Sequence, residues 1–394
     1  LNQFGVPTIA FTRWDDDAKE TTENIGKNVV LHRIQIGKID KQPKEFLWEK
    51  EQLAYDKISE ILDSLGFVPD IVHGIYWYSG VVATQVAEKY KSAFIYTVIS
   101  LGKVKHKFQQ SIAAHDLARE KFEEQILQKA NAVLSVSQQE KNNILALYSG
   151  VIEEKVFVIG RGLDPNLFTD KPNQHDLFLQ KELLAQGSSG PLLFAGRLIW
   201  SKGYSFFFDI YDNLLRDASF QAPPLWIVGG TPDEIHNAKN NAEYSNLLRE
   251  AENKGLIRWW GIVPRNIMPA YYRNSTCTCL PSLYDPAARV VIESMACGTP
   301  VIMTPTGYSD EAVKTGINGY IAEYGDKFSW INYIKALVSD EIWRKTLGLQ
   351  ARETVYPHFT MYEFWNRQYE VYTRVKKNDI NGSTLEKKIK ISSL

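Results

Sequence analysis

The sequence predicts an α/β protein made of two doubly wound domains that face a common cleft. Its 394 residues exceed the length at which a single hydrophobic core stops growing, about 250 to 300 residues. In both halves, short β-branched or aromatic runs alternate with longer helical patterns, which is typical of βαβ units and a parallel sheet. A polar stretch at residues 169–190 separates the halves and has the composition of a linker or loop.

The first half, residues 1–168, is predicted to form one of these domains. Its predicted strands are residues 8–12, 29–36, 70–73, 93–98, 132–136 and 155–159. Its predicted helices are residues 45–64, 114–129 and 138–147. Apolar residues recur at helical spacing along the first of these helices, and Gly66 and Pro69 follow it as stop signals. The chain starts at Leu1 without a Met and turns almost at once, so we expect residues before Leu1 to be missing.

The second half, residues 169–358, repeats the alternation. Its predicted strands are residues 192–195, 225–228, 257–260, 276–280, 301–304 and 320–322. Residues 359–375 are aromatic-rich with a helical pattern, whereas residues 376–394 are polar and predicted to be a frayed tail. Two Rossmann-like domains place the carboxyl ends of both sets of strands at a shared cleft, where ligands bind. The fold alone does not identify a function, so the function has to be inferred from the loops at those strand ends.

Composition excludes several classes of protein. Forty-five basic and forty-six acidic residues give a net charge of -1, so no overall field attracts nucleic acid. No apolar run approaches the roughly 18 residues of a spanning helix and no signal segment opens the chain, which predicts a cytoplasmic protein. Nothing in the sequence indicates peripheral membrane contact. Three cysteines fit a reduced compartment. Cys277 and Cys279 alternate on a predicted strand, and buried thiols are favoured over a metal-ligand pair because no second Cys/His pair follows.

The loop after the strand at 192–195 offers two cations to one spot. Gly196 lets the backbone come close to a ligand, and Arg197 and Lys202 could clamp phosphate oxygens, the arginine through two hydrogen bonds and the lysine as a point charge. A pyrophosphate fits such a loop. The alternative is a pair of solvated surface cations near a turn.

The segment at residues 281–300 carries two carboxylates. Asp285 and Pro286 predict a helix start, with Asp285 as the cap, and Gly298 marks the helix end. The free N–H groups and the dipole of that helix favour an anion at the Asp285 end. Glu293, about two turns further on, could accept hydrogen bonds from sugar hydroxyls. The alternative is a capped core helix with Glu293 on its solvent side.

The order of these residues resembles the donor domain of retaining GT-B glycosyltransferases. It consists of Gly-Arg-Leu at 196–198, Lys-Gly at 202–203, an acid at 285, Glu293, and Met-Ala-x-Gly-x-Pro-Val at 295–301. Residues 69–77, 97–103, 138–140 and 162–168 add a likeness to the sucrose-phosphate-synthase-like branch, the glycosyl transferases group 1. The resemblance extends from Pro7 to Tyr372.

The resemblance implies a function and a set of site residues. Residues 1–168 would form the acceptor-side domain, residues 169–358 the donor domain, and residues 359–375 a helix that crosses back. Arg197 and Lys202 would hold the donor diphosphate and Glu293 the ribose, while Asp285 and the backbone amides after it would hold the hexose. The full set comprises catalytic Asp285, Arg197 and Lys202, the donor-binding residues Gly196, Ala287, Ala288, Arg289 and Glu293, and the acceptor-side residues Tyr76, Ser100, Lys103 and Lys107.

The implied reaction transfers a hexose with retention from a nucleoside-diphosphate sugar, most simply a UDP-sugar, to a hydroxyl acceptor. The acceptor hydroxyl would attack from the face that the leaving phosphate vacates, so no protein nucleophile is required and catalysis consists of positioning and charge stabilisation. No cofactor and no metal are expected, because side chains supply the cations near the phosphates.

This chain departs from the family pattern at several places. Asp285 stands where Glu is usual, Ala287-Ala288-Arg289 replaces Phe-Gly-Leu, and Ile99 replaces a His near the sugar. The Gly-rich acceptor loop after the first strand is not found. Arg289 adds a cation near the donor unless it points to solvent, and Arg pairs with a planar carboxylate. We therefore hypothesise that the preferred donor is not plain UDP-glucose and that a hexuronic acid donor is a candidate.

Other interpretations of single features stay open. Residues 15–17, three aspartates, could chelate a metal or be solvated. The basic cluster Lys103, Lys105, His106 and Lys107 could receive a phosphorylated acceptor or form a solvated face. His73 is predicted equally as a packed residue or a ligand contact. The whole protein could instead be a catalytically silent nucleotide-sugar-binding module, favoured by Ile99, Ala287 and Ala288, or a sugar-nucleotide epimerase of similar architecture.

Overall fold

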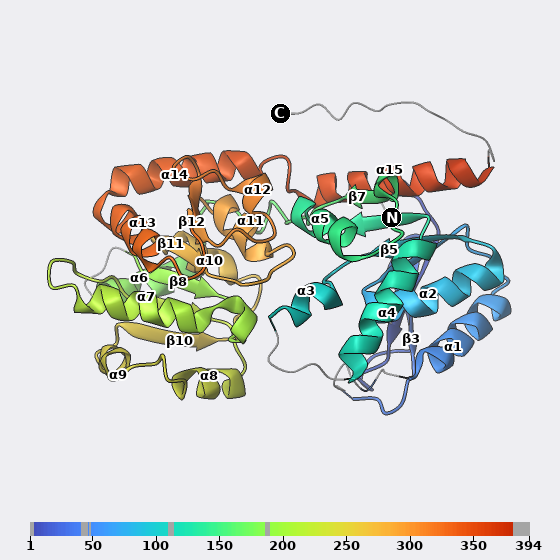
Figure 1. The fold of residues 1–394 in the computed structure, drawn as a ribbon, viewed down its shortest axis with the longest axis horizontal. Coiled ribbons are helices and arrows are strands. Elements are labelled where there is room, and N and C mark those ends of the chain that lie inside the picture. The colour runs from blue at the N-terminus through green and yellow to red at the C-terminus, as the bar shows by residue number, and fades with distance from the viewer. Residues whose placement is uncertain (1–3, 41–45, 47–48, 109–113, 186–189, 381–394) are drawn as a thin grey trace.

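The computed structural model describes residues 4–40, 46, 49–108, 114–185 and 190–380, and it has the predicted α/β architecture. Two Rossmann-like halves lie side by side, each with a parallel sheet covered by helices (Figure 1).

The sheet of the first half is parallel, in the order β4-β5-β6-β7. Its strands are β4 (Ile71–Ile75), β5 (Ala93–Thr97), β6 (Ala132–Ser135) and β7 (Val156–Val158). Its helices are α1 (Glu51–Ser64), α2 (Trp77–Tyr90), α3 (Gly102–His106), α4 (Ala114–Lys129) and α5 (Gln138–Leu147). Strands β5 and β6 are buried throughout, as expected for strands with both faces covered.

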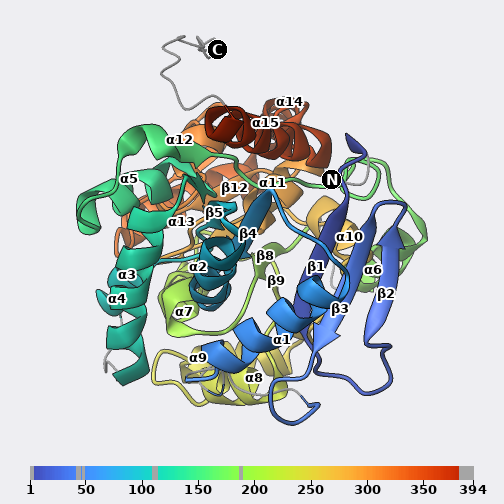
Figure 2. The same cartoon turned by 90° about the vertical axis from the view of Figure 1, so that its right-hand side faces the viewer.

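A separate three-stranded sheet precedes it, in the order β1-β3-β2. Strands β1 (Thr8–Arg13) and β3 (Val29–Ile34) are parallel and match predicted strands, whereas β2 (Thr22–Gly26) pairs antiparallel to β3 and was not predicted. The sequence of β2 is polar and ends in glycine, and the strand is largely exposed, so backbone pairing forms it without an apolar face. Figure 2 shows this sheet beside α1, which packs on β3.

The second half contains a six-stranded parallel sheet in the order β10-β9-β8-β11-β12-β13. The strands are β8 (Leu192–Ala195), β9 (Leu225–Val228), β10 (Ile257–Gly261), β11 (Cys277–Leu280), β12 (Val301–Met303) and β13 (Gly319–Ile321), and they match the predicted strands closely. The strand order reverses between β8 and β11. This reversal is a topological switch point, the place where doubly wound sheets bind ligands beyond their strand ends.

The helices of the second half cover both faces of that sheet. They are α6 (Gln174–Ala185), α7 (Tyr204–Arg216), α8 (Pro232–Lys239), α9 (Asn246–Asn253), α10 (Met268–Arg273), α11 (Arg289–Ala296), α12 (Ser309–Ala312), α13 (Lys327–Ser339) and α14 (Glu341–Val355).

The predicted linker and the predicted start of the first helix were wrong. The predicted linker at 169–190 contains α6, which buries Leu179 and Leu183 in the core and its Asp176 against Arg273. Six of the twelve residues of α6 are apolar, but the polar residues on either side of the helix gave the whole stretch the composition of a linker. Residues 186–189 of that stretch lie outside the described residues. The helix predicted at 45–64 begins at Glu51, and residues 41–45 and 47–48 also lie outside them.

The last helix, α15 (Met361–Ile380), returns to the first half as predicted. Figures 1 and 2 show α15 lying against the first half. Its Val371, Tyr372 and Val375 pack against Ile95 and Leu134 of β5 and β6. The prediction of a tail from residue 376 was wrong for residues 376–380, because the helix continues to Ile380. Residues 381–394 lie outside the described residues.

Candidate active site

The predicted donor loops meet at the switch point of the second sheet. The loop after β8 passes directly over the loop after β11, where Leu283 N donates to Ser201 O at 2.9 Å. Gly203 makes this approach possible, since its φ is +68° and a Cβ there would lie 1.8 Å from Pro281 O. Any larger residue at this position would push the two loops apart.

Lys202 and Asp285, predicted to act on phosphate and sugar, form an ion pair with each other. Their side chains are 24% and 18% exposed, so both still reach solvent. Together with Gly196 and Ser282 they line a small cavity of about 50 Å³. The two loops therefore bring a cation and a carboxylate to one point, as the sequence predicts.

Arg197 lies apart from this cavity. Its Nε and Nη2 donate to Glu234 Oε1 at 3.1 and 2.7 Å, and its side chain is 67% exposed. Glu234 is fixed in turn by a capping box with Thr231 at the start of α8. Arg197 can approach a phosphate beside Lys202 only by leaving Glu234.

The prediction that Asp285 caps a helix was wrong. Helix α11 begins at Arg289 with Ala288 at the N-cap position, and no side chain caps it. Lys202 holds the Asp285 carboxylate. The backbone of Asp285 packs tightly on Gly307, because a Cβ added at Gly307 would lie 2.3 Å from Asp285 O. The segment is therefore committed to a turn, and the uncapped end of α11 follows four residues later.

Glu293 faces inward. It is 7% exposed, which contradicts the alternative that placed it on the solvent side. Tyr272 donates to its Oε2 at 3.1 Å, and Arg265 Nη2 lies 3.4 Å from its Oε1. Burial raises the pKa of Glu293, and the charges of Arg265 and Arg289 act against this rise. Sequence reasoning missed Arg265, which comes from a loop far from Glu293 in the chain.

On the acceptor side, Tyr76 and Ser100 follow the neighbouring strands β4 and β5. Tyr76 has a φ of +74°, an uncommon conformation for a non-glycine residue and one that concentrates at functional sites. Both residues contact Arg119 of α4, whose Nη2 donates to Ser100 O at 2.5 Å and to Ser100 Oγ at 3.2 Å. The Tyr76 hydroxyl lies 3.5 Å from Nη1 of the same guanidinium. Arg119 was not predicted, because nothing in a helical pattern marks one arginine as buried.

The predicted basic cluster is mostly occupied by its own neighbours. Lys103 Nζ donates to Leu147 O at 2.9 Å and lies 3.7 Å from Glu124. His106 contacts Glu120 of α4. Lys107 is exposed at the end of α3. Lys103 is thus turned toward α4 and α5, whereas Lys107 is open to solvent.

His73 lies between β5 and the returning helix. Its Nδ1 is 2.6 Å from the Tyr372 hydroxyl and its Nε2 is 2.7 Å from Thr97 Oγ1, so it is a packed residue. Ile99, which replaces the family's His, is half-buried just after β5.

The residues considered as metal ligands are also placed. Asp16 of the aspartate run lies 3.3 Å from Lys19. Cys277 and Cys279 are fully buried, with their Sγ atoms 3.8 Å apart. Within the described part of the chain, no three His, Cys, Asp or Glu side chains are grouped to hold a metal ion.

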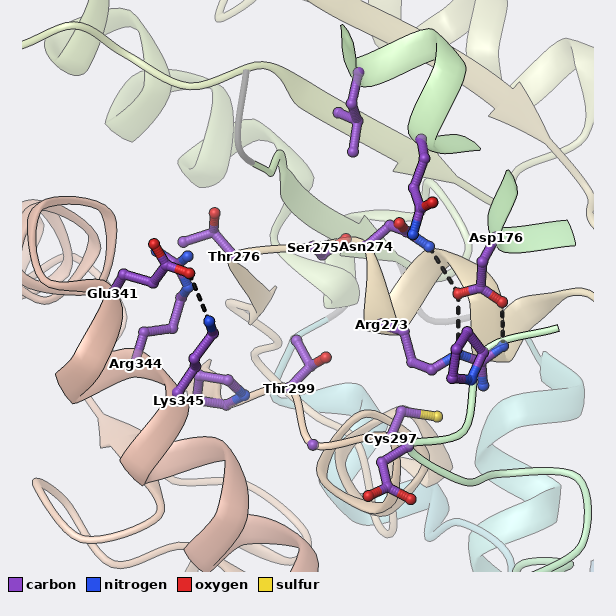
Figure 3. A pocket seen from close by; sticks show the side chains of 16 residues that line it. Asp176, Arg273, Asn274, Ser275, Thr276, Cys297, Thr299, Glu341, Arg344 and Lys345 are labelled. Carbon is purple, nitrogen blue, oxygen red and sulfur yellow. Dashed lines mark hydrogen bonds and ion pairs between the residues drawn. The ribbon is translucent and has the colours of Figure 1, made fainter. Parts of the chain in front are cut away.

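A larger cavity of about 580 Å³ lies elsewhere, where β11 and β12 begin. Figure 3 shows Asp176 bonded to Arg273 and Asn274 on one side and Glu341 paired with Lys345 on the other. These charged side chains are already paired with one another, and the amino ends of strands are not where doubly wound sheets bind ligands. The smaller cavity at the switch point is therefore the better candidate site.

None of the helices in the described part of the chain has the length and apolar character needed to span a membrane.

Comparison with known proteins yields matches for both halves. Residues 178–354 match the family model of glycosyl transferases group 1, and residues 1–167 match that of glycosyltransferase family 4. The chain is 26% identical over 359 residues to D-inositol 3-phosphate glycosyltransferase of Paenarthrobacter aurescens strain TC1, covering 88% of this chain and 84% of the relative.

Solved structures share the fold. Sucrose-phosphate synthase from Thermosynechococcus elongatus has a TM-score of 0.82 and 24% identity, covering 95% of this chain and 90% of that one. Anabaena HepE in complex with UDP and glucose has a TM-score of 0.69 and 15% identity, covering 93% and 99%.

Proposed function

The chain belongs to the GT-B glycosyltransferases of the group 1 family, and we propose that it transfers a hexose with retention, without a metal, from a UDP-sugar to a hydroxyl acceptor. The observation that carries this proposal is the meeting of Lys202 and Asp285 at the switch point, beside the uncapped end of α11. A cation, a carboxylate and free helix N–H groups together suit a sugar diphosphate.

In the proposed reaction, the acceptor oxygen attacks the anomeric carbon while the bond from that carbon to the diphosphate oxygen breaks. The acceptor proton passes to the leaving phosphate. Lys202 and the N-terminus of α11 stabilise the charge on the diphosphate, and Glu293 accepts hydrogen bonds from the ribose. Asp285 orients the hexose, and its pairing with Lys202 supports a positioning role over attack on the sugar. Arg197 releases Glu234 and binds the phosphate in its place.

The acceptor would lie at Tyr76 and Ser100, with Lys107 at the rim. The name of the Paenarthrobacter relative specifies an inositol phosphate. A phosphorylated polyol is therefore the first acceptor class to assay with this chain.

Donor binding tests the proposal. We expect Lys202→Ala to weaken UDP binding about 10- to 150-fold, the value of one charge-assisted hydrogen bond, and Arg197→Ala to weaken it as well. Isothermal titration calorimetry measures both. Lys335→Ala is the matched control, because Lys335 is also a half-buried lysine paired with an aspartate, Asp217, but lies outside the cleft. Unchanged UDP affinity in both cleft variants would refute the assignment.

Product analysis tests the chemistry. Turnover of a UDP-sugar should persist in EDTA, and the anomeric configuration of the product, read by NMR, should equal that of the donor. Loss of turnover in EDTA with recovery on adding Mg²⁺ or Mn²⁺ would favour a metal at residues 15–17. If the protein binds the donor but neither transfers nor hydrolyses the sugar, the result supports the catalytically silent binding module instead.

A further inference from the structure

Arg161 lies in the segment that leads from the first half into the second. It follows β7, between two glycines and two fixed points of the backbone. On one side, Ile159 O accepts from Arg367 Nε at 2.9 Å, and on the other, Leu163 N donates to Phe359 O at 2.9 Å. A Cβ at Gly162 would lie 2.7 Å from Met361 Cα, so the segment is packed against the start of α15.

Contacts lead from this segment to the candidate donor site. A Cβ at Gly160 would lie 3.8 Å from the hydroxyl of the buried Tyr308. Tyr308 follows Gly307, which packs directly on the backbone of Asp285. Arg161 is therefore brought from the first half to the edge of the proposed sugar site.

The electrostatics agree with this placement. Burial lowers the pKa of Arg161, and the like charge of Arg289 lowers it further, whereas Tyr308 and Asp285 raise it. The charge of Arg289 also acts on Glu293, one turn along the same face of α11. The side chain of Arg289 is exposed to solvent, and its charge still acts on Glu293 and on Arg161 from the second half.

The two arginines carry charge that the site does not balance. Asp285 is paired with Lys202. Across the described residues, no hydrogen bond or ion pair engages the guanidinium of Arg161 or of Arg289. A half-buried guanidinium facing another cation is unfavourable unless an anion joins them. A planar carboxylate fits because each arginine can hold it through two parallel hydrogen bonds.

We propose that Arg161 and Arg289 together bind a carboxylate on the transferred sugar, so that the donor is a nucleotide hexuronic acid. The inference rests on the proposed function and names its substrate class. Lys202 and the end of α11 already serve the diphosphate, and Glu293 serves the ribose, which leaves the hexose as the part of the donor nearest Asp285. A phosphate on the acceptor has the same chemistry, and the experiment separates the two sources.

The first measurement finds the base and compares the sugars. Thermal shift with UDP, GDP, ADP and dTDP identifies the nucleotide that stabilises the parent protein most. Calorimetry then compares the binding affinities of the hexose donor and the hexuronic acid donor that carry that nucleotide. We expect the parent to bind the hexuronic acid donor at least about 10-fold more tightly, the lower value for one charged hydrogen bond. Equal affinity, or preference for the hexose, overturns the inference while nucleotide binding leaves the proposed function intact.

Variants then assign the preference to the two arginines. Arg161→Gln and Arg289→Leu should each reduce the affinity ratio of hexuronic acid to hexose donor by about 10-fold or more. Arg216→Leu, an exposed arginine on α7, is the control and should keep the parent ratio. If the arginine variants weaken the free nucleoside diphosphate as much as the hexuronic acid donor, the arginines serve the diphosphate and the inference fails. If they instead raise the KM of a phosphorylated acceptor and leave the donor ratio alone, the anion belongs to the acceptor. If no nucleotide binds at all, the proposed function itself falls.

Discussion

Tyr76 and Ser100, the two predicted acceptor-side residues at neighbouring strand ends, are held by a third residue that the sequence did not indicate. Arg119 reaches both from α4, and its Nε donates to the fully buried Glu123 at 2.7 Å. Glu123 Oε2 in turn accepts from Gly102 N at 2.8 Å. A buried ion pair of this kind is costly to break on one side only, because the remaining charge has no partner.

We therefore expect Arg119→Lys to raise the acceptor KM at least several-fold while UDP affinity stays within about twofold of the parent. Lysine keeps the charge but lacks the planar fork that bonds Ser100 and Glu123 together. Steady-state kinetics against acceptor and donor measure the two effects. Arg273→Lys is the matched control, since it alters the buried pair with Asp176 far from the cleft and should lower stability without changing the acceptor KM. Equal effects of both variants on KM would show that Arg119 contributes only to stability.

At the scale of elements, α15 is joined to the first sheet by an apolar face and by one histidine. His73 of β4 bridges Thr97 of β5 and Tyr372 of α15. Burial lowers the pKa of His73 to about 4. The unfolded chain protonates this histidine at about pH 6.5, so between these values the unfolded state binds more protons than the folded one. Stability is therefore lost as the pH falls from about 6.5 toward 4.

This linkage predicts a measurable pH dependence. Between pH 7.5 and 5, His73 should account for about 2 kcal/mol of lost stability, at about 1.4 kcal/mol for each pH unit below 6.5. His73→Gln cannot take up the proton and should show a decline smaller by that amount, although it starts less stable. Urea unfolding of both proteins at the two pH values gives the difference. Parallel declines would mean that the folded protein binds this proton as readily as the unfolded chain.

At the scale of the whole molecule, Tyr284 joins the two halves next to Asp285. Its hydroxyl accepts from Leu101 N at 2.9 Å and donates to Glu140 Oε1 at 2.7 Å. Gln139 adds two backbone contacts across the same interface, to Pro305 O at 3.0 Å and from Gly307 N at 2.6 Å. Burial raises the pKa of Glu140 to about 7. The donor loop and the acceptor-side loop are thus connected through one tyrosine and one titratable carboxyl group.

Tyr284→Phe should destabilise the protein by about 1 to 3 kcal/mol, because it leaves the buried Leu101 N–H without an acceptor and Glu140 with only the hydrogen bond from Asn143. We expect the loss to be larger at pH 8 than at pH 6, since a buried carboxyl group that has lost its tyrosine donor costs more to bury when it is charged. Denaturant titrations at both pH values measure it. Tyr211→Phe removes a buried hydroxyl that donates to Pro223 O and should give a loss that does not depend on pH. If the loss of stability in Tyr284→Phe is also independent of pH, the result contradicts the prediction that Tyr284 stabilises the charged form of Glu140.

The sequence determined the repeating βαβ order, most strand positions and the loops that meet at the switch point. These features are local, because periodicity, glycines and short motifs report on neighbouring residues. Lys202 and Asp285 could be paired from sequence only through the family order of their loops. The sequence identified Arg289 as a departure from the family pattern. It did not predict that Arg289 lies on the same face of α11 as Glu293.

Tertiary structure alone decided which charges are buried and what they face. Asp176 pairs with Arg273 from a stretch that was predicted as a linker, and Asp285 pairs with Lys202 instead of capping α11. Arg119 and Arg161 were invisible as site residues, because the Tyr76 and Ser100 that Arg119 holds lie on other elements and the charges that act on Arg161 lie in the other half. A sequence pattern records the polarity of a residue, whereas the energy of a buried charge depends on groups that only the folded chain brings near it.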